Sequence, residues 1–287
     1  MSTATRGLIL CPVDFSESSR HALRWAGEMA RRSGAPLAVL YADRFLPPPH
    51  FTAGQIDTLL EELGKSRQAA RESLAALARD LVPAGIAVET LVEEELAVPA
   101  IVRVARDRQA GLVVMGSHGH SGFERVMLGS VTEKVLRLTD RPVLVVKGGT
   151  GAAPAAPDIR SILCPVDLVD GCREALELSA RLAADFGARL EVLHVVEKNG
   201  SEAGLQAARE RLVECVPEEV RGRCTLREAV RGGNAAEEIL SAAKESGSDL
   251  VVLATRHKTF WDATVLGSTA ARIVRHATCP VLAVPIS

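Results

Sequence analysis

The sequence has little net charge and no long apolar run, and both absences exclude classes of protein. Its 34 Lys and Arg residues nearly balance 36 Asp and Glu residues, giving a formal net charge of −2. Such a chain has no broad basic surface to neutralise a nucleic-acid backbone, so we expect no nucleic-acid partner. It has no run of about 18 apolar residues, so we expect no membrane association. Residues 1–7 lack the apolar region of a signal peptide, and we expect a cytoplasmic protein.

Metal-binding and catalytic motifs are also scarce. The six cysteines form no Cys-x-x-Cys pair and no zinc-ligand spacing, so we expect free thiols. The chain has no Gly-x4-Gly-Lys-Ser/Thr motif and hence no P-loop lysine. His118 and His120 have no neighbouring carboxylate partner, which favours a solvated loop over a metal site. No paired nucleophile and general base is evident, so we expect no catalytic residues and no enzyme activity.

An internal repeat sets the domain organisation. The hexapeptide Ile9–Asp14 returns unchanged as Ile162–Asp167, 153 positions later. Leu128-Gly-Ser130 returns as Leu266-Gly-Ser268, now at an offset of 138. The first copy therefore carries about fifteen extra residues, and the proline-containing stretch Phe45–Gly64 is the natural place for them. We predict that this stretch forms a mobile flap near the ligand site.

The repeat predicts two α/β domains, at residues 1–147 and 158–287, joined by a linker of small residues at 148–157. In each copy short apolar runs alternate with helical patterns, which predicts an open parallel sheet of five strands covered on both faces. Ligands in such sheets bind beyond the carboxyl ends of the strands, where the strand order reverses. The predicted strands are 8–11, 36–42, 88–92, 112–115 and 143–146, then 162–164, 190–195, 226–230, 250–253 and 281–284.

A glycine-punctuated loop follows the fourth predicted strand of the first copy. It begins Gly116-Ser-His-Gly119 and ends Gly129-Ser130. Glycines let a backbone approach an anion closely, and the free amides of a helix N-terminus favour negative charge. We predict Ser130 as the helix N-cap, forming a capping box with Glu133. Asp14, at the end of the first strand, is either an acceptor for a ribose or base edge or a helix N-cap, and the residues alone leave both open.

The spacing Gly116-x2-Gly119-x9-Gly129-Ser130 resembles the nucleotide signature of the ATP-binding universal stress proteins. The resemblance implies two tandem Rossmann-like domains of the adenine nucleotide alpha hydrolase-like type, with ATP as ligand and Mg²⁺ as its accompanying ion. It also implies a regulatory or protective role in the stress response. Asp14 would hold the adenine and ribose side, and the glycine loop would line the phosphates. The implied binding residues are Pro12, Val13, Asp14, Ala42, Met115, Gly116, Gly119, Gly129, Ser130 and Val131.

The second copy departs from this signature. Ala254 and His257 stand at the positions of Gly116 and Gly119. A Cβ at residue 257 would crowd the phosphate and penalise a positive φ. We predict a decayed site in the second copy, although side-chain contacts from Arg256, His257 and Lys258 to a phosphate stay open.

Three functions remain open. The first is a nucleotide-responsive regulatory protein with an unknown protein partner, the second a non-catalytic interaction module without functional nucleotide binding, and the third a weak ATPase. For assembly, the resemblance predicts that strands 143–146 and 281–284 pair, because each would otherwise be an exposed apolar edge. The two domains would then form an internal pseudo-dimer, and association of whole chains into a homodimer stays open.

Overall fold

The computed structural model describes residues 7–44, 53–119, 128–147, 157–168, 172–197, 201–256 and 267–286, without the side chains of residues 53–63 and 256. The first repeat comprises β1 (Ile9–Pro12), α1 (Glu17–Ser33), β2 (Leu37–Ala42), α2 (Ala53–Leu81), β3 (Val88–Glu93), α3 (Ala97–Asp107), β4 (Leu112–Gly116), α4 (Ser130–Leu138) and β5 (Val143–Val146). The second comprises β6 (Ser161–Val166), α5 (Arg173–Phe186), β7 (Arg189–Val196), α6 (Glu202–Cys215), α7 (Glu218–Arg221), β8 (Leu226–Gly232), α8 (Ala235–Glu245), β9 (Leu250–Arg256), α9 (Ser268–His276) and β10 (Val281–Ile286).

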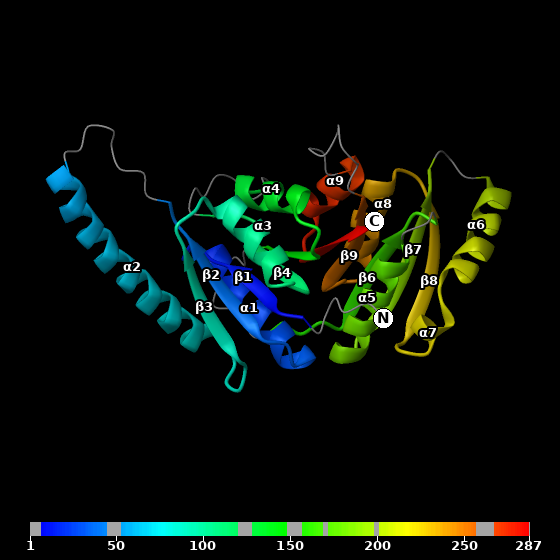
Figure 1. Ribbon diagram of the computed structural model, residues 1–287. Helices are drawn as coiled ribbons and strands as arrows, with labels where there is room; N and C mark the ends of the chain where they lie inside the picture. Colours follow the sequence, from blue (N-terminus) through cyan, green and yellow to red (C-terminus); the bar gives the residue numbers. More distant parts are fainter. Residues whose placement is uncertain are drawn as a thin grey trace.

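The strands form one sheet in the order β3-β2-β1-β4-β5-β10-β9-β6-β7-β8. All pairs within a repeat are parallel, and both repeats have the same internal order, which confirms the predicted fold class. The repeats meet through β5 and β10, which pair antiparallel with Leu144 opposite Leu282. The predicted pairing of the two final strands is therefore confirmed. In Figure 1, α2 and α6 lie at opposite flanks of the molecule.

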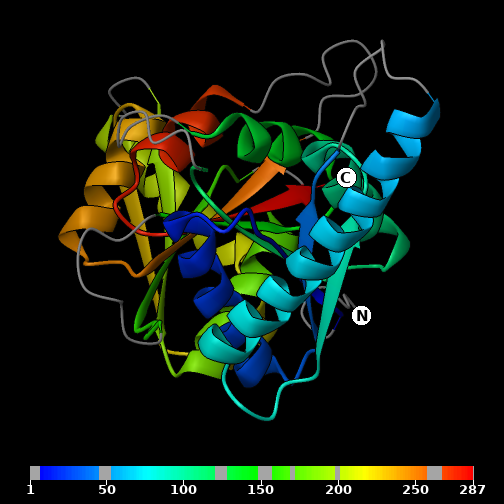
Figure 2. The ribbon, with the colours of Figure 1, turned by 90° about the vertical axis from the view of Figure 1, so that its left-hand side faces the viewer.

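Helices cover both faces of the sheet. Along β1, Ile9 and Cys11 pack on the face covered by α1, α2, α5, α6 and α7, whereas Leu10 packs on the face covered by α3, α4, α8 and α9. Alternate side chains of a strand point to opposite faces, so a doubly covered sheet needs a continuous apolar run in each strand. Figure 2 shows the sheet between its helices, with α2 nearest the viewer.

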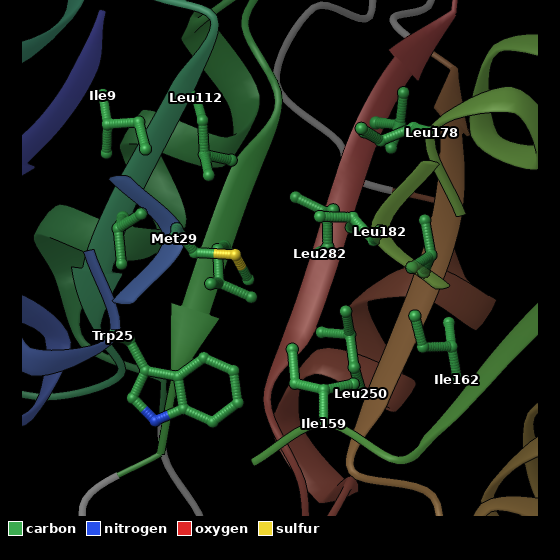
Figure 3. Close-up of a cluster of buried hydrophobic side chains, with 14 of the residues drawn as sticks. Ile9, Trp25, Met29, Leu112, Ile159, Ile162, Leu178, Leu182, Leu250 and Leu282 are labelled. Carbon is green, nitrogen blue, oxygen red and sulfur yellow. The ribbon is translucent and has the colours of Figure 1, made fainter. Parts of the chain in front are cut away.

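The core continues from one repeat into the other. Trp25 and Met29 of α1 are buried in the same apolar cluster as Leu178 and Leu182 of α5. These residues occupy equivalent positions in the two copies, 153 residues apart. Figure 3 shows Trp25 and Met29 to the left of Leu282 and the two α5 leucines to its right. The repeats are thus joined by side-chain packing as well as by the strand ladder.

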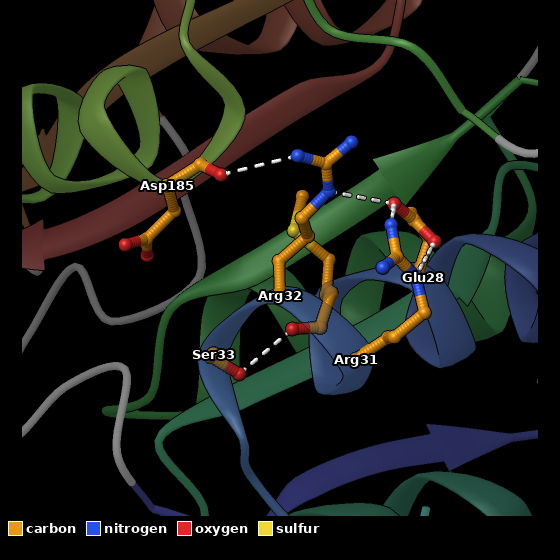
Figure 4. Close-up of polar contacts among 6 residues, drawn as sticks. Glu28, Arg31, Arg32, Ser33 and Asp185 are labelled. Atoms are coloured by element: carbon orange, nitrogen blue, oxygen red, sulfur yellow. Dashed lines mark hydrogen bonds and ion pairs between the residues drawn. The ribbon is translucent and has the colours of Figure 1, made fainter. Parts of the chain in front are cut away.

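A buried carboxylate organises polar contacts between the repeats (Figure 4). Glu28 is only 3% exposed, and its carboxylate accepts hydrogen bonds from Arg31 at 2.6 and 2.7 Å and from Arg32 Nε at 2.8 Å. The hydrogen bonds from Arg31 hold the pKa of Glu28 below its ordinary value, despite burial. Arg32 in turn donates to the carbonyl oxygen of Asp185 at 3.3 Å and lies 5.0 Å from the ring centroid of Phe186. Glu28 therefore holds Arg32 against α5.

The extra residues of the first repeat lie largely in a helix. Helix α2 has 29 residues and its counterpart α6 has 14. The flap prediction for Phe45–Gly64 is therefore wrong for residues 53–64, and residues 45–52 lie outside the described residues. The reason is local propensity, because residues 53–64 include three Leu and two Glu, which favour helix. No helix among the described residues is long and apolar enough to cross a membrane.

Candidate functional site

A pocket lies beyond the carboxyl ends of β1, β2 and β4, at the N-terminus of α4. Strand order reverses between β1 and β4, which is where an open α/β sheet leaves a crevice. The pocket has a volume of about 180 Å³, and all ten residues implied by the signature line it. They are Pro12, Val13, Asp14, Ala42, Met115, Gly116, Gly119, Gly129, Ser130 and Val131.

The turn after β1 holds the carboxylate of Asp14. Its Oδ1 accepts hydrogen bonds from the backbone amide of Ser16 at 3.0 Å and from the Ser16 hydroxyl at 2.5 Å. Ser16, not Asp14, is the N-cap of α1, and its hydroxyl accepts from the amide of Ser19 at 3.2 Å. Phe15 adopts a φ of 64°, a left-handed conformation that is rare for a residue other than glycine. The sharp turn thus holds Asp14 through its Oδ1.

The first two signature glycines are required for different reasons. A Cβ at Gly119 would lie 2.7 Å from Oδ2 of Asp14, so the loop backbone approaches this carboxylate closely. A Cβ at Gly116 would instead clash with Ser18, meeting its hydroxyl and approaching its backbone carbon to 2.9 Å. Gly116 therefore allows α1 to pack against the end of β4. Gly119 allows the loop to close over the acidic side of the pocket.

No side chain of the described residues caps the helix N-terminus at the pocket. The N-cap is Gly129, and Ser130 is the first residue of α4, so the predicted capping box of Ser130 and Glu133 is wrong. Glu133 pairs instead with Arg137 and with Arg275 of α9. The helix starts one residue early because Gly129 is already extended, with ψ at 143°. A glycine cap leaves the first-turn amides without an intrahelical partner, and this suits an anion.

Six further residues line the pocket that the signature did not indicate. Thr132 matters most, because its hydroxyl donates to the carbonyl oxygen of Gly116 at 2.8 Å and ties α4 to β4. Its position two residues after Ser130 could have indicated it. Ala97 and Ile101 of α3 are spaced by one helical turn, a signal that also fits a core-facing stripe. The full set is Ser19, Leu40, Ala97, Ile101, His118 and Thr132.

The sequence profile of the universal stress protein family matches residues 6–147 and 158–285, nearly the whole chain. The chain belongs to the universal stress protein family. This membership supports a role in the stress response.

Relatives include tandem and single-domain members. A universal stress protein of Mycolicibacterium smegmatis is 26% identical over 303 residues, covering 99% of each chain. Universal stress protein MJ0531 of Methanocaldococcus jannaschii is 32% identical over 140 residues, covering 48% of this chain and 81% of that protein. The crystal structure of a universal stress protein from Archaeoglobus fulgidus matches 99% of this chain and 98% of that chain, with a TM-score of 0.68 and 21% identity. The last comparison shows the shared tandem fold.

The second repeat of this universal stress protein carries a different pocket at the equivalent place. It has a volume of about 470 Å³ and is lined by Asp167, Glu197 and mostly apolar residues. Ala270 stands where Thr132 ties α4 to β4, so the matching hydrogen bond to residue 254 is lost. Arg256 ends β9, while His257 and Lys258 lie outside the described residues.

Proposed function

We propose that the first repeat binds one ATP molecule and that the protein acts as a nucleotide-responsive regulatory factor in the stress response. The observation that carries this proposal is the uncapped N-terminus of α4, which opens on the same pocket as Asp14. Free amides and the helix dipole favour an anion, and a carboxylate accepts hydrogen bonds from hydroxyl or amino groups. A nucleotide presents both kinds of group.

The two ends of the pocket would contact different parts of ATP, the glycine loop its phosphates and Asp14 its ribose. Gly119, Gly129, Ser130 and Val131 would face the phosphates, since glycine backbone can approach an anion without a side chain between. Asp14 would accept from the ribose. Mg²⁺ that accompanies ATP would be held mainly by phosphate oxygens and water, because the described residues include no cluster of three His, Cys, Asp or Glu suited to a metal ion.

Binding without hydrolysis is part of the proposal. Asp14 is the single carboxylate among the described lining residues of the first pocket. In the proposed binding mode this carboxylate faces the ribose and not the terminal phosphate, so no described carboxylate of the pocket lining is left to activate an attacking water. A regulatory protein of this kind would signal through its bound state to an unknown protein partner.

The second repeat is proposed not to bind ATP in the same way. Its described pocket lining carries Asp167 and Glu197 and no lysine or arginine. Asp167 corresponds to Asp14, but Glu197 adds a second carboxylate that would repel a triphosphate, and Ala254 and His257 replace the first two signature glycines. We therefore expect one ATP per chain.

Isothermal titration of the full chain with Mg·ATP tests this expectation. Asp14→Asn should weaken binding, whereas Asp167→Asn should leave affinity and stoichiometry unchanged. Two equal sites per chain would contradict the proposed difference between the repeats. Native mass spectrometry of the purified protein would show any nucleotide carried over from the cell.

The same purified protein distinguishes the two alternative functions, a weak ATPase and an interaction module without nucleotide binding. Release of inorganic phosphate from ATP above the rate in buffer, lost in Asp14→Asn, would establish a weak ATPase. Absence of any heat of binding or bound nucleotide would favour the interaction module. Neither outcome would alter the family assignment.

A further inference from the structure

Two cysteines of the second repeat are in contact. The Sγ atoms of Cys172 and Cys215 lie 3.2 Å apart, although the residues are separated by 43 positions in the chain. Cys172 is the N-cap residue of α5, and Cys215 is the last residue of α6. Both are free thiols in the structure. The ends of two helices are thus brought together through sulfur.

The pair lies beside the turn that carries Asp167. Cys172 takes the place of Ser19, whose hydroxyl accepts from the amide of Asp14 in the first repeat. From α6, Arg211 donates to the carbonyl oxygen of Leu168 at 3.2 Å. The end of α6 therefore already contacts this turn, and a covalent bond between the two sulfurs would fix it there.

The two thiols fit a metal site less well than a disulfide. Cys164 and Asp167 also interact electrostatically with Cys172. No group of three or more such side chains in the described part of the chain is placed to hold a metal ion. Structural zinc needs four ligands in tetrahedral geometry. Two sulfurs in direct contact fit a disulfide better than a metal centre.

We propose that Cys172 and Cys215 are a site of reversible oxidation, at which a hydroperoxide converts the two thiols into a disulfide. Cys215 is the more exposed of the two residues, and its sulfur attacks the hydroperoxide first. It displaces water from hydrogen peroxide and becomes a sulfenic acid. The Cys172 sulfur then attacks the Cys215 sulfur, the S–O bond breaks, and the hydroxyl leaves as a second water with the thiol proton. Closing the contact to a disulfide of about 2.05 Å requires a shift of about 1 Å.

The surroundings of Cys172 keep the pair reduced until an oxidant is present. Burial, together with the contact to Cys215, raises the pKa of Cys172 to about 12. A thiol is a poor nucleophile compared with its thiolate, so spontaneous oxidation by air is slow. Once a hydroperoxide has oxidised Cys215, the Cys215 sulfur is electrophilic and already in contact with Cys172, so even a weak nucleophile can attack it.

Thiol counting on the full chain tests the proposal. The protein is treated with increasing hydrogen peroxide, quenched in acid, denatured and alkylated with N-ethylmaleimide. Intact mass should change from six adducts to four, and dithiothreitol should restore six. Tryptic digestion should yield peptides 161–173 and 212–221 joined by a reducible bond.

Variants identify the sulfurs involved. Peptide 161–173 also contains Cys164, so Cys164→Ser must keep the cross-link, whereas Cys172→Ser and Cys215→Ser must abolish it. Cys279→Ser is the matched control and should still lose two thiols. Retention of all six adducts, a cross-link through Cys164, or oxygen addition without a cross-link would each overturn the proposal. Fragmentation of the cross-linked peptide from the unmutated chain assigns the bond to Cys172 or to Cys164 even if a variant fails to fold.

Discussion

The Oδ2 atom of Asp14 lies 2.7 Å from the position that a Cβ would occupy on Gly119. The loop after β4 and the turn after β1 therefore close on each other without room for a single methyl group. In the second repeat the residue at the equivalent loop position is His257. Gly119 thus faces the side chain of Asp14, whereas Gly116 faces Ser18. A substitution at each glycine therefore disturbs a different contact, and the two can be tested separately.

Gly119→Ala should weaken ATP binding at least about tenfold, which corresponds to about 1.4 kcal/mol. The new methyl group pushes against the end of a flexible side chain, so the Asp14 carboxylate moves and the fold is little affected. Isothermal titration measures the affinity, and urea unfolding measures the stability.

Gly116→Ala is the control for this pair. Its Cβ would meet the backbone of Ser18, which cannot move freely, so we expect a loss of about 1–3 kcal/mol in the free energy of unfolding. Unchanged ATP affinity in Gly119→Ala would show that the close contact with Asp14 has no role in binding.

Gly129→Asp should remove the stabilisation that ATP gives. At 100 times Kd, ATP should add about 2.7 kcal/mol to the unmutated protein. An aspartate at the N-cap would accept first-turn amides itself and repel the phosphates. Its Cβ would also lie 3.1 Å from the carbonyl oxygen of Ser117, so the variant should be somewhat less stable without ligand.

The equivalent Gly267→Asp change provides the comparison, because a Cβ there has no atom of the described residues within 4 Å. It should keep the full ATP-induced rise in Tm, measured by differential scanning fluorimetry. Equal shifts in both variants would place the phosphates elsewhere.

Glu28→Gln should destabilise the protein at neutral pH by about 1–3 kcal/mol, because charged hydrogen bonds to two arginines are lost. The pKa of Glu28 is lowered by Arg31, so its stabilisation is fully present above the ordinary value of 4.5. The stabilisation is lost as pH falls through the folded value. The difference between wild type and variant, measured by urea unfolding, should therefore shrink below about pH 4.5.

Glu177→Gln removes an exposed pair with Arg173 at 2.9 Å and serves as the control. We expect it to change stability by less than about 1 kcal/mol. A pH-independent difference for Glu28→Gln would indicate a packing effect instead of a charge effect.

An isolated first repeat, residues 1–147, should dimerise. It would expose β5, whose Leu144 is fully buried against Leu282 in the whole chain, and an apolar edge strand of this kind pairs readily. Sedimentation velocity should show twice the mass of the fragment, and Leu144→Asp should shift it toward monomer. A fragment that stays monomeric at high concentration would argue against the edge as the main junction.

The sequence predicted the strands well, and their ends less well. Every predicted strand exists, because a strand buried on both faces requires a continuous apolar run. The helix start at Ser130 was misjudged because serine is a common N-cap, whereas the backbone at Gly129 is already extended. The flap at residues 45–64 was partly misjudged because prolines at its start were given more weight than the helix-forming residues after them.

The spacing of the glycines indicated the binding residues, but it did not indicate why each position must be glycine. Nothing in the sequence tells that Gly116 makes room for Ser18 and Gly119 for Asp14, since these contacts join segments about 100 residues apart. The same holds for Thr132, whose partner Gly116 is on another element.

By itself the sequence determined the repeat, the α/β class and the place of the pocket. The repeat and the glycine spacing can be read directly along the chain, and in parallel α/β sheets the pocket lies at the reversal of strand order. The tertiary structure alone decided which atoms meet. Three contacts depend on how the strands and helices pack together: the pairing of Leu144 with Leu282, the hydrogen bond from Arg32 to Glu28, and the contact of Cys172 with Cys215. Such contacts are set by the packing of side chains from distant segments, which no local pattern encodes.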